Sequence, residues 1–278
     1  MNRSRVVLVF SGGGARAGAH LGASRAMTGL GITPAQYVAT SMGAVMAAML
    51  AAGVSAEEAL DQVSALHDRD VVRADRLSFL KGLWARKILE EAPLREAMRR
   101  LVPFERFTDL KTPLTVVATE MVSGARVCFG HGGEDVPLQD ALYATCALPV
   151  YYPPATINGR EYVDGGLRAV LPLEVAAAFH PSAVIAVDVG AGFDETPSTR
   201  PASLPPVVEA HGNAVRILMA EQTSQALALW RATPGRPPLV YIRPPAERGA
   251  TFRVDQMRRY AQEGYDAAIK ALADLPTS

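Results

Sequence analysis

The feature that most constrains this chain is an uninterrupted apolar run, residues 6–10, that ends in a cluster of glycines. Such a run is typical of a central parallel strand, because both faces of that strand are buried. A glycine-rich stretch, residues 11–18, and a helical stretch, residues 19–29, come next. A buried strand, a glycine loop and a helix in this order predict the first unit of an α/β fold.

The glycine loop does not fit the common nucleotide-binding motifs. A dinucleotide-binding loop needs an acidic residue about twenty positions further on, but the chain has no Asp or Glu between Met1 and Ala56. A phosphate-binding loop needs a Lys after the glycines, and none is present. The loop offers backbone N–H groups at a helix N-terminus, which can bind an oxyanion. The alternative is a plain tight turn.

A serine separates the next predicted strand and helix. A short β-prone run leads to Ser41, and the nearly apolar residues 42–52 predict a buried helix. A serine on such a tight turn exposes its hydroxyl, as in the nucleophile elbow G-x-S-x-G. The pattern reads A-x-S-x-G here, with Ala39 and Gly43 as the small neighbours. The alternative is that the serine only caps the helix.

The rest of the chain alternates between strands and helices. Further strands are predicted at residues 114–119, 125–129, 183–189 and 239–242, and further helices at residues 138–146, 207–230 and 254–272. This alternation predicts a single α/β domain over residues 1–278 with a largely parallel sheet. Its motifs lie within residues 6–189, and residues 190–278 add covering helices and a last strand.

Two segments are candidates for a lid. In residues 71–101 a helical pattern interleaves apolar and basic residues. It fits an amphipathic helix that covers the sheet, or an interfacial helix that touches lipid. Residues 193–206 contain four prolines and predict a mobile surface loop.

Composition narrows the class of partner. Acidic and basic residues number 28 each, so no net field favours nucleic acid. Cys128 and Cys146 are too few for a disulfide framework, and their apolar context suits a reducing compartment. No apolar run is long enough for a transmembrane helix or for a signal peptide. The sequence therefore predicts a soluble, cytoplasmic protein.

Four stretches together resemble the patatin-like phospholipase family. They are the glycine loop at residues 12–16, the Ser41 elbow, residues 144–149 (ATCALP) and residues 164–166 (DGG). An Asp before two glycines is by itself typical of a turn, but the order and spacing of all four match bacterial members of the family. The resemblance covers roughly residues 6–189 and implies a three-layer α/β/α fold around a central, mostly parallel sheet.

The sequence departs from the family pattern at two positions. Ala39 stands at the first elbow position, where the family usually has glycine, and Ala17 stands where the glycine loop expects one. Alanine is the next smallest residue, and Gly18 follows Ala17 directly. Neither position touches a reacting atom.

The resemblance implies a lipid acyl hydrolase that uses a Ser–Asp dyad and needs no histidine, cofactor or metal. By this analogy Ser41 is the nucleophile and Asp164 is the base that takes its proton. The carboxylate must then lie within hydrogen-bond reach of the hydroxyl. An acyl-Ser41 intermediate forms and is released by water. The implied partners are a lipid or other acyl ester and, transiently, a membrane surface.

The resemblance also implies an oxyanion hole. Its donors are the backbone N–H groups of Gly12, Gly13 and Gly14, and Arg16 fixes the loop or adds positive potential. The residues that support the elbow and the Asp motif are Ala39, Met42, Gly43, Gly165 and Gly166.

Two other functions stay open from the sequence. The first is an α/β-hydrolase triad in the order Ser–Asp–His, with His180 or His211 as its histidine. The second is a non-catalytic module that binds lipid or protein, because a fold does not determine a function. The residues do not show which ester is cleaved, since an apolar pocket discriminates chain length only weakly.

Overall fold

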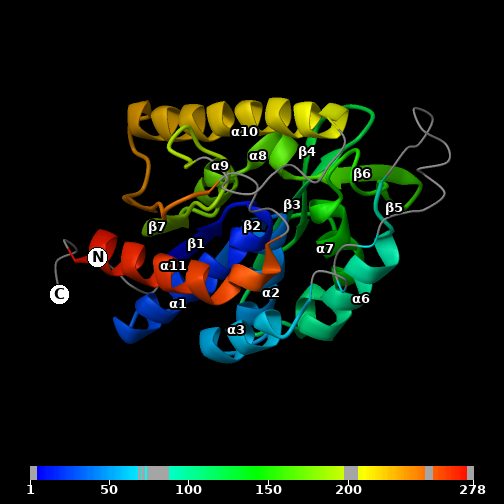
Figure 1. Cartoon of the computed structure of the whole chain (residues 1–278). Coiled ribbons are helices and arrows are strands. Elements are labelled where there is room, and N and C mark those ends of the chain that lie inside the picture. Colours follow the sequence, from blue (N-terminus) through cyan, green and yellow to red (C-terminus); the bar gives the residue numbers. More distant parts are fainter. Residues whose placement is uncertain are drawn as a thin grey trace.

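The computed structural model describes residues 5–67, 70, 73, 88–196, 206–247 and 253–273. Within these ranges an eight-stranded sheet lies between two layers of helices (Figure 1). The strands are β1 (Val6–Phe10), β2 (Gln36–Thr40), β3 (Leu114–Glu120), β4 (Arg126–Gly130), β5 (Ala155–Ile157), β6 (Arg160–Asp164), β7 (Ala183–Val187) and β8 (Leu239–Ile242). The predicted three-layer α/β/α architecture is confirmed.

The sheet is mixed but mostly parallel. Its order is β5-β6-β3-β2-β1-β7-β8, and β4 pairs with β3 away from this path. Strands β3, β2, β1, β7 and β8 are parallel neighbours. Strands β4 and β6 run antiparallel to β3, and β5 runs antiparallel to β6. The parallel part therefore forms the centre, with antiparallel strands added at one side.

Helices cover both faces of this sheet. They are α1 (Gly18–Gly29), α2 (Met42–Ala51), α3 (Ala56–Ser64), α6 (Glu91–Leu101), α7 (Leu138–Cys146), α8 (Gly166–Ala169), α9 (Leu173–Ala177), α10 (Pro206–Ala232) and α11 (Met257–Leu272). Short 3₁₀ turns, η2 (Gly14–Ala17), η4 (Phe107–Asp109) and η6 (Val254–Gln256), lie in connections between strands and helices. In Figure 1, α8, α9 and α10 lie on one side of the sheet, and α1, α2 and α11 lie on the other.

Strand β1 contributes to two separate apolar cores. Val6, Leu8 and Phe10 pack into the cluster formed with α1, α2 and α11. Val7 and Val9 face the opposite way and pack with α9 and α10. This is the burial expected of successive side chains on a central strand, because they point to opposite faces of the sheet. The apolar run that opens the chain is therefore buried on both sides.

The hairpin formed by β5 and β6 was not predicted. Its turn is Asn158–Gly159, and both residues have positive φ, at 50° and 77°. Asn-Gly is the dipeptide that two-residue hairpin turns favour, so the sequence did contain the signal. The hairpin matters because it makes Asp164 the last residue of a paired strand instead of part of a free turn.

The two lid predictions fall largely outside the described residues. Of the helix predicted over residues 71–101, the structure describes α6, and residues 71, 72 and 74–87 lie outside. Of the loop predicted over residues 193–206, residues 197–205 lie outside. Both lids stay predictions.

Helices α1 and α11 join distant parts of the chain through close backbone contact. A Cβ atom on Gly22 of α1 would overlap the carbonyl group of Ala261 in α11. A Cβ atom on Gly264 of α11 would overlap the carbonyl group of Ala19 in α1. Both positions therefore need glycine, because a side chain would hold the helices apart.

We expect Gly22→Ala to lower the free energy of unfolding by about 1–3 kcal/mol, because the added methyl group overpacks this contact. Gly29→Ala is the matched control, since it lies in the same helix and a Cβ there would meet nothing within 4 Å. We expect the control to keep or raise stability by about 0.5–1 kcal/mol. Urea denaturation measures both variants, and equal unfolding midpoints would contradict the packing.

Candidate active site

Ser41 forms a sharp turn between β2 and α2. The strand ends at Thr40 and the helix begins at Met42, so one residue makes the whole turn. Its backbone has φ 54° and ψ −138°, a conformation that residues with side chains rarely adopt. The Ser41 hydroxyl makes no capping hydrogen bond to α2. The turn therefore has the form of a nucleophile elbow, and the hydroxyl does not act as a helix cap.

The Ser41 hydroxyl is hydrogen-bonded directly to Asp164. Ser41 Oγ donates to Asp164 Oδ2 at 2.8 Å, although the residues are 123 positions apart. Strand β3 lies between their two strands: its Val117 pairs with Thr40, and its Ala118 pairs with Asp164. Both side chains are buried, with residue exposures of 9% for Ser41 and 5% for Asp164.

Burial makes Asp164 a stronger base than an ordinary carboxylate. Loss of hydration raises the pKa of Asp164 from 3.8 to about 6. Hydrogen bonds from the Gly166 N–H group, at 2.7 Å to Oδ1, and from the Ser41 hydroxyl oppose part of that rise. The group is mostly ionised at neutral pH, and its pKa lies near the range that suits a general base.

The glycine loop passes beside Ser41. A Cβ atom on Gly12 would lie 3.2 Å from Ser41 Cβ, and one on Gly13 would lie 2.5 Å from the carbonyl oxygen of Val189. The Gly12 N–H group donates to the Val170 carbonyl at 3.1 Å, so it is already occupied. Among the described residues, the N–H groups of Gly13 and Gly14 have no hydrogen-bond partner. Of the three glycines predicted as oxyanion donors, only Gly13 and Gly14 therefore have an N–H group free to donate within the described structure.

The positive charge of Arg16 is paired with a buried carboxylate. Its Nη1 donates to Glu195 Oε1 at 2.6 Å, and Arg216 Nη1 donates to Glu195 Oε2 at 3.1 Å. The Glu195 side chain is 1% exposed. Of the two roles predicted for Arg16, these contacts support fixing the loop, because a buried carboxylate pairs with its charge. Glu195 was not anticipated from the sequence.

The small residues around the dyad are places where backbones meet. A Cβ atom on Gly43 would overlap the Ser11 carbonyl oxygen, and one on Gly165 would overlap the Val117 carbonyl oxygen. A Cβ atom on Gly166 would lie 3.0 Å from Asp164 Oδ1. Gly43 and Gly165 therefore let neighbouring backbones approach the site closely, and Gly166 leaves room for the Asp164 carboxylate.

Ala39 and Met42 complete the predicted support of the elbow. Ala39 is fully buried on the side of β2 that joins the larger core. The Met42 sulfur lies 3.9 Å from Cys146 Sγ at the end of α7. Burial raises the pKa of the Cys146 thiol well above its usual value, and the negative charge of the nearby Asp164 raises it further. Cys146 therefore stays a neutral thiol next to the dyad.

His20 lies close to the glycine loop and supports it. Its Nε2 is 2.9 Å from the Ser11 carbonyl oxygen, so this nitrogen must carry the proton. Its ring stacks on Phe10, with 4.4 Å between ring centroids. Burial lowers the pKa of His20 to about 3, and the Ser11 contact opposes the fall. His20 is therefore neutral and acts as a packing residue.

Neither histidine of the alternative triad bonds to Asp164. In the described part of the chain, the two carboxylate oxygens bind Gly166 N–H and the Ser41 hydroxyl. His211 is a half-buried residue on α10. His180 lies before β7, toward the end of the sheet opposite Ser41, because Ser41 follows the carboxyl end of a strand parallel to β1 and β7.

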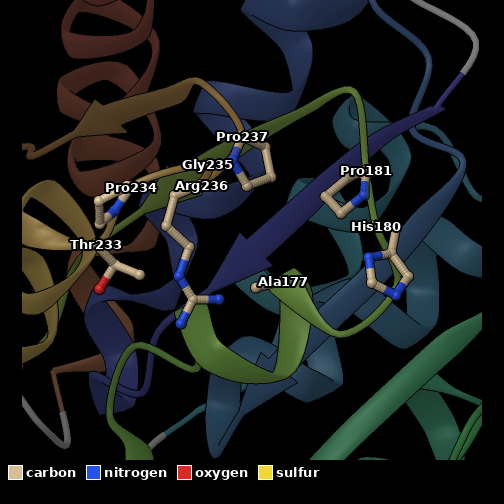
Figure 2. Close-up of a pocket in the computed structure, with 8 residues that line it drawn as sticks. All are labelled: Ala177, His180, Pro181, Thr233, Pro234, Gly235, Arg236 and Pro237. Carbon is tan, nitrogen blue, oxygen red and sulfur yellow. The ribbon is translucent and has the colours of Figure 1, made fainter.

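A surface hollow near His180 is separate from the dyad. The hollow has a volume of about 420 Å³. It lies where α9 ends and just before β7 and β8 begin (Figure 2). Its lining residues are Ala177, His180, Pro181, Thr233, Pro234, Gly235, Arg236 and Pro237. Neither Ser41 nor Asp164 lines it, so it adds nothing to the chemistry of the dyad.

Two other kinds of feature are absent from the described residues. No three of their His, Cys, Asp or Glu side chains are grouped so as to hold a metal ion. None of their helices combines the length and the apolar character needed to cross a bilayer.

Parts of this chain are similar in sequence to known proteins. An uncharacterized NTE family protein of Mycobacterium bovis is 31% identical over 185 residues, covering 66% of this chain and 49% of that protein. An omega-hydroxyceramide transacylase of Mus musculus is 27% identical over 142 residues, covering 50% of this chain and 23% of that protein. The chain thus spans about half the length, or less, of these curated relatives.

A solved structure shares the fold. VipD from Legionella pneumophila superposes with a TM-score of 0.52 at 16% identity, covering 97% of this chain and 67% of that chain. At this identity the likeness concerns the fold alone. The family model described as patatin-like phospholipase matches residues 8–177, which is more than half of the sequence. The chain belongs to the patatin-like phospholipase family.

Proposed function

We propose that this chain is a lipid acyl hydrolase that cleaves carboxylic esters with a Ser41–Asp164 dyad. The observation that carries the proposal is the direct 2.8 Å hydrogen bond from Ser41 Oγ to Asp164 Oδ2. Membership of the patatin-like phospholipase family supports lipid esters as the class of substrate. The sharp backbone turn at Ser41 supports its role as nucleophile.

The reaction begins with attack of Ser41 Oγ on the ester carbonyl carbon, while Asp164 Oδ2 accepts the hydroxyl proton. The oxyanion that forms accepts hydrogen bonds from the N–H groups of Gly13 and Gly14. Collapse of this intermediate breaks the ester C–O bond, and the departing alcohol takes the proton from Asp164. An acyl-Ser41 ester remains.

Water completes the cycle. The water oxygen attacks the acyl carbonyl carbon while Asp164 accepts a proton from the water molecule, and a second tetrahedral oxyanion forms. Collapse of that oxyanion breaks the bond to Ser41 Oγ, and Asp164 returns the proton to the serine. The products are a carboxylic acid, an alcohol and the original dyad, so no histidine is needed.

The orientation of Asp164 suits a base that acts alone. Oδ1 is fixed by the Gly166 N–H group, which leaves Oδ2 directed at the Ser41 hydroxyl. A histidine takes the serine proton in a triad, because its ordinary pKa of about 6.5 makes it a stronger base than a carboxylate with an ordinary pKa of about 3.9. Burial raises the pKa of Asp164 to about 6 and makes up part of that difference.

We expect Ser41→Ala to lower kcat/KM by about 10³-fold or more, and Asp164→Asn to lower it by about 10²–10⁴-fold. Hydrolysis of p-nitrophenyl esters and lysophospholipids, with a panel of chain lengths, measures the effect. Ser24→Ala is a control in a buried serine of α1 and should keep full activity.

A fluorophosphonate probe, which reacts with activated serines, should label the wild-type protein at Ser41 and leave Ser41→Ala unlabelled. Folded wild-type protein that resists the probe would instead support a non-catalytic binding module.

We expect kcat/KM to rise about tenfold per pH unit below pH 6 and to level off above it. Asp164 is protonated below its pKa of about 6 and cannot accept the serine proton. A pH profile of ester hydrolysis between pH 4 and 8, which spans about two units on each side of that pKa, provides the test. A flat profile across pH 5–7 would count against Asp164 as the base.

We expect His180→Ala and His211→Ala to keep kcat/KM within about threefold of wild type and to keep the same acidic limb. Neither side chain is bonded to Asp164 in the described structure. A triad makes the opposite prediction, because loss of its histidine lowers kcat by several orders of magnitude. Such a loss in either variant would replace the dyad with the triad.

A further inference from the structure

Thr145 is hydrogen-bonded to the turn at Ser41 and to the turn that follows Asp164. It is a fully buried residue of α7, next to the end of that helix. Its hydroxyl oxygen accepts a hydrogen bond from the Ser41 backbone N–H group at 2.8 Å. Its carbonyl oxygen accepts one from the N–H group of Gly165, the residue after Asp164, at 3.3 Å. One residue thus connects the elbow with the turn that carries the carboxylate.

The hydroxyl of Thr145 is itself anchored to the strand between those turns. It donates to the Val117 carbonyl oxygen of β3 at 2.5 Å. Val117 pairs with Thr40, and the next residue of β3 pairs with Asp164. The same Val117 carbonyl oxygen is the atom that a Cβ on Gly165 would overlap. The Ser41 elbow, the turn after Asp164 and helix α7 therefore all lie against the Val117 peptide group of β3.

The Ser41 backbone needs such an anchor. A residue held at φ 54° and ψ −138° is strained by an amount of order 1–3 kcal/mol and keeps that conformation only when its surroundings fix it. On the helix side, the Ser41 carbonyl oxygen accepts from the Ala44 N–H group at 2.8 Å. On the strand side, Thr145 binds the Ser41 N–H group. Because this N–H group is occupied, it cannot serve as an oxyanion donor.

We propose that Thr145 is a positioning residue that holds Ser41 Oγ within hydrogen-bond distance of Asp164 Oδ2. It acts through the Ser41 backbone and contacts no reacting atom. Loss of its hydroxyl leaves the buried Ser41 N–H group without an acceptor and lets the strained turn relax. A shift of about 1 Å in a reacting group can lower a rate about 10²-fold. The proposal rests on the proposed function, because only a reacting dyad makes this distance matter for rate.

Thr145→Val tests the proposal, because valine keeps the shape of threonine and removes the hydroxyl. We expect kcat for p-nitrophenyl butyrate to fall about 10–100-fold, with KM within about twofold of wild type. Thr145→Ser restores the hydroxyl and should return kcat to within about threefold. If Thr145→Val does not fold, Thr145→Ala removes the same hydroxyl without leaving a mismatched methyl group.

Thr115→Val is the matched control. Thr115 is a fully buried residue near the other end of β3. Its hydroxyl accepts from Gln36 Nε2 at 3.0 Å and donates to the His131 carbonyl at 2.6 Å, the same pattern as Thr145. This variant should lose similar stability in urea and keep wild-type kcat. An equal fall of kcat in Thr115→Val and Thr145→Val would assign the effect to general destabilisation and overturn the proposal.

A second readout does not depend on turnover. The Ser41 hydrogen bond lowers the pKa of Asp164, so losing it should raise that pKa. Titration of the Asp164 carboxyl carbon by ¹³C NMR should therefore show a higher pKa in Thr145→Val and in Ser41→Ala, but not in Thr115→Val. An unchanged titration and unchanged kcat in Thr145→Val would overturn the positioning role. An inactive wild-type protein that still shows the shift would overturn the proposed function alone.

Discussion

The contact between Ser41 and Asp164 depends on the register of strand β3 with its two neighbours. Thr40 pairs with Val117 on one side of β3, and Asp164 pairs with Ala118 on the other. A slip of one residue in either pairing would turn that strand's side chains to the opposite face of the sheet. The apolar residues of the two cores oppose such a slip, because they would lose their burial. Core packing thus fixes where the serine and the carboxylate meet.

The electrostatics of the site follow from the same burial. A cation beside a carboxylate lowers its pKa and weakens it as a base. Arg16, the charged residue of the glycine loop, is paired with Glu195 instead. Asp164 receives its hydrogen bonds from an N–H group and a hydroxyl, both uncharged. Desolvation therefore dominates, and the pKa of Asp164 rises to about 6.

The parts of this fold that the sequence predicts are those with a local pattern. Strand β1 follows from its run of apolar residues, and the predicted bounds of α7 agree with the structure. The β5–β6 hairpin escaped prediction because three-residue β5 is too short for a periodic pattern. Thr145 and Glu195 escaped as site residues because their partners lie 104 and 179 positions away. A local sequence pattern does not predict a hydrogen bond between residues so far apart in the chain.

The two departures from the family pattern have a physical explanation in the packing. In the glycine loop the backbone contact falls on Gly18, where a Cβ atom would lie 2.8 Å from the Met257 carbonyl oxygen. Ala17 is fully buried in the larger core, so its methyl group has a place there. Ala39 likewise adds its methyl group to that core. Glycine is kept where another backbone would meet a Cβ atom, as at Gly43 and Gly165, and alanine replaces it where the neighbours leave room for a methyl group.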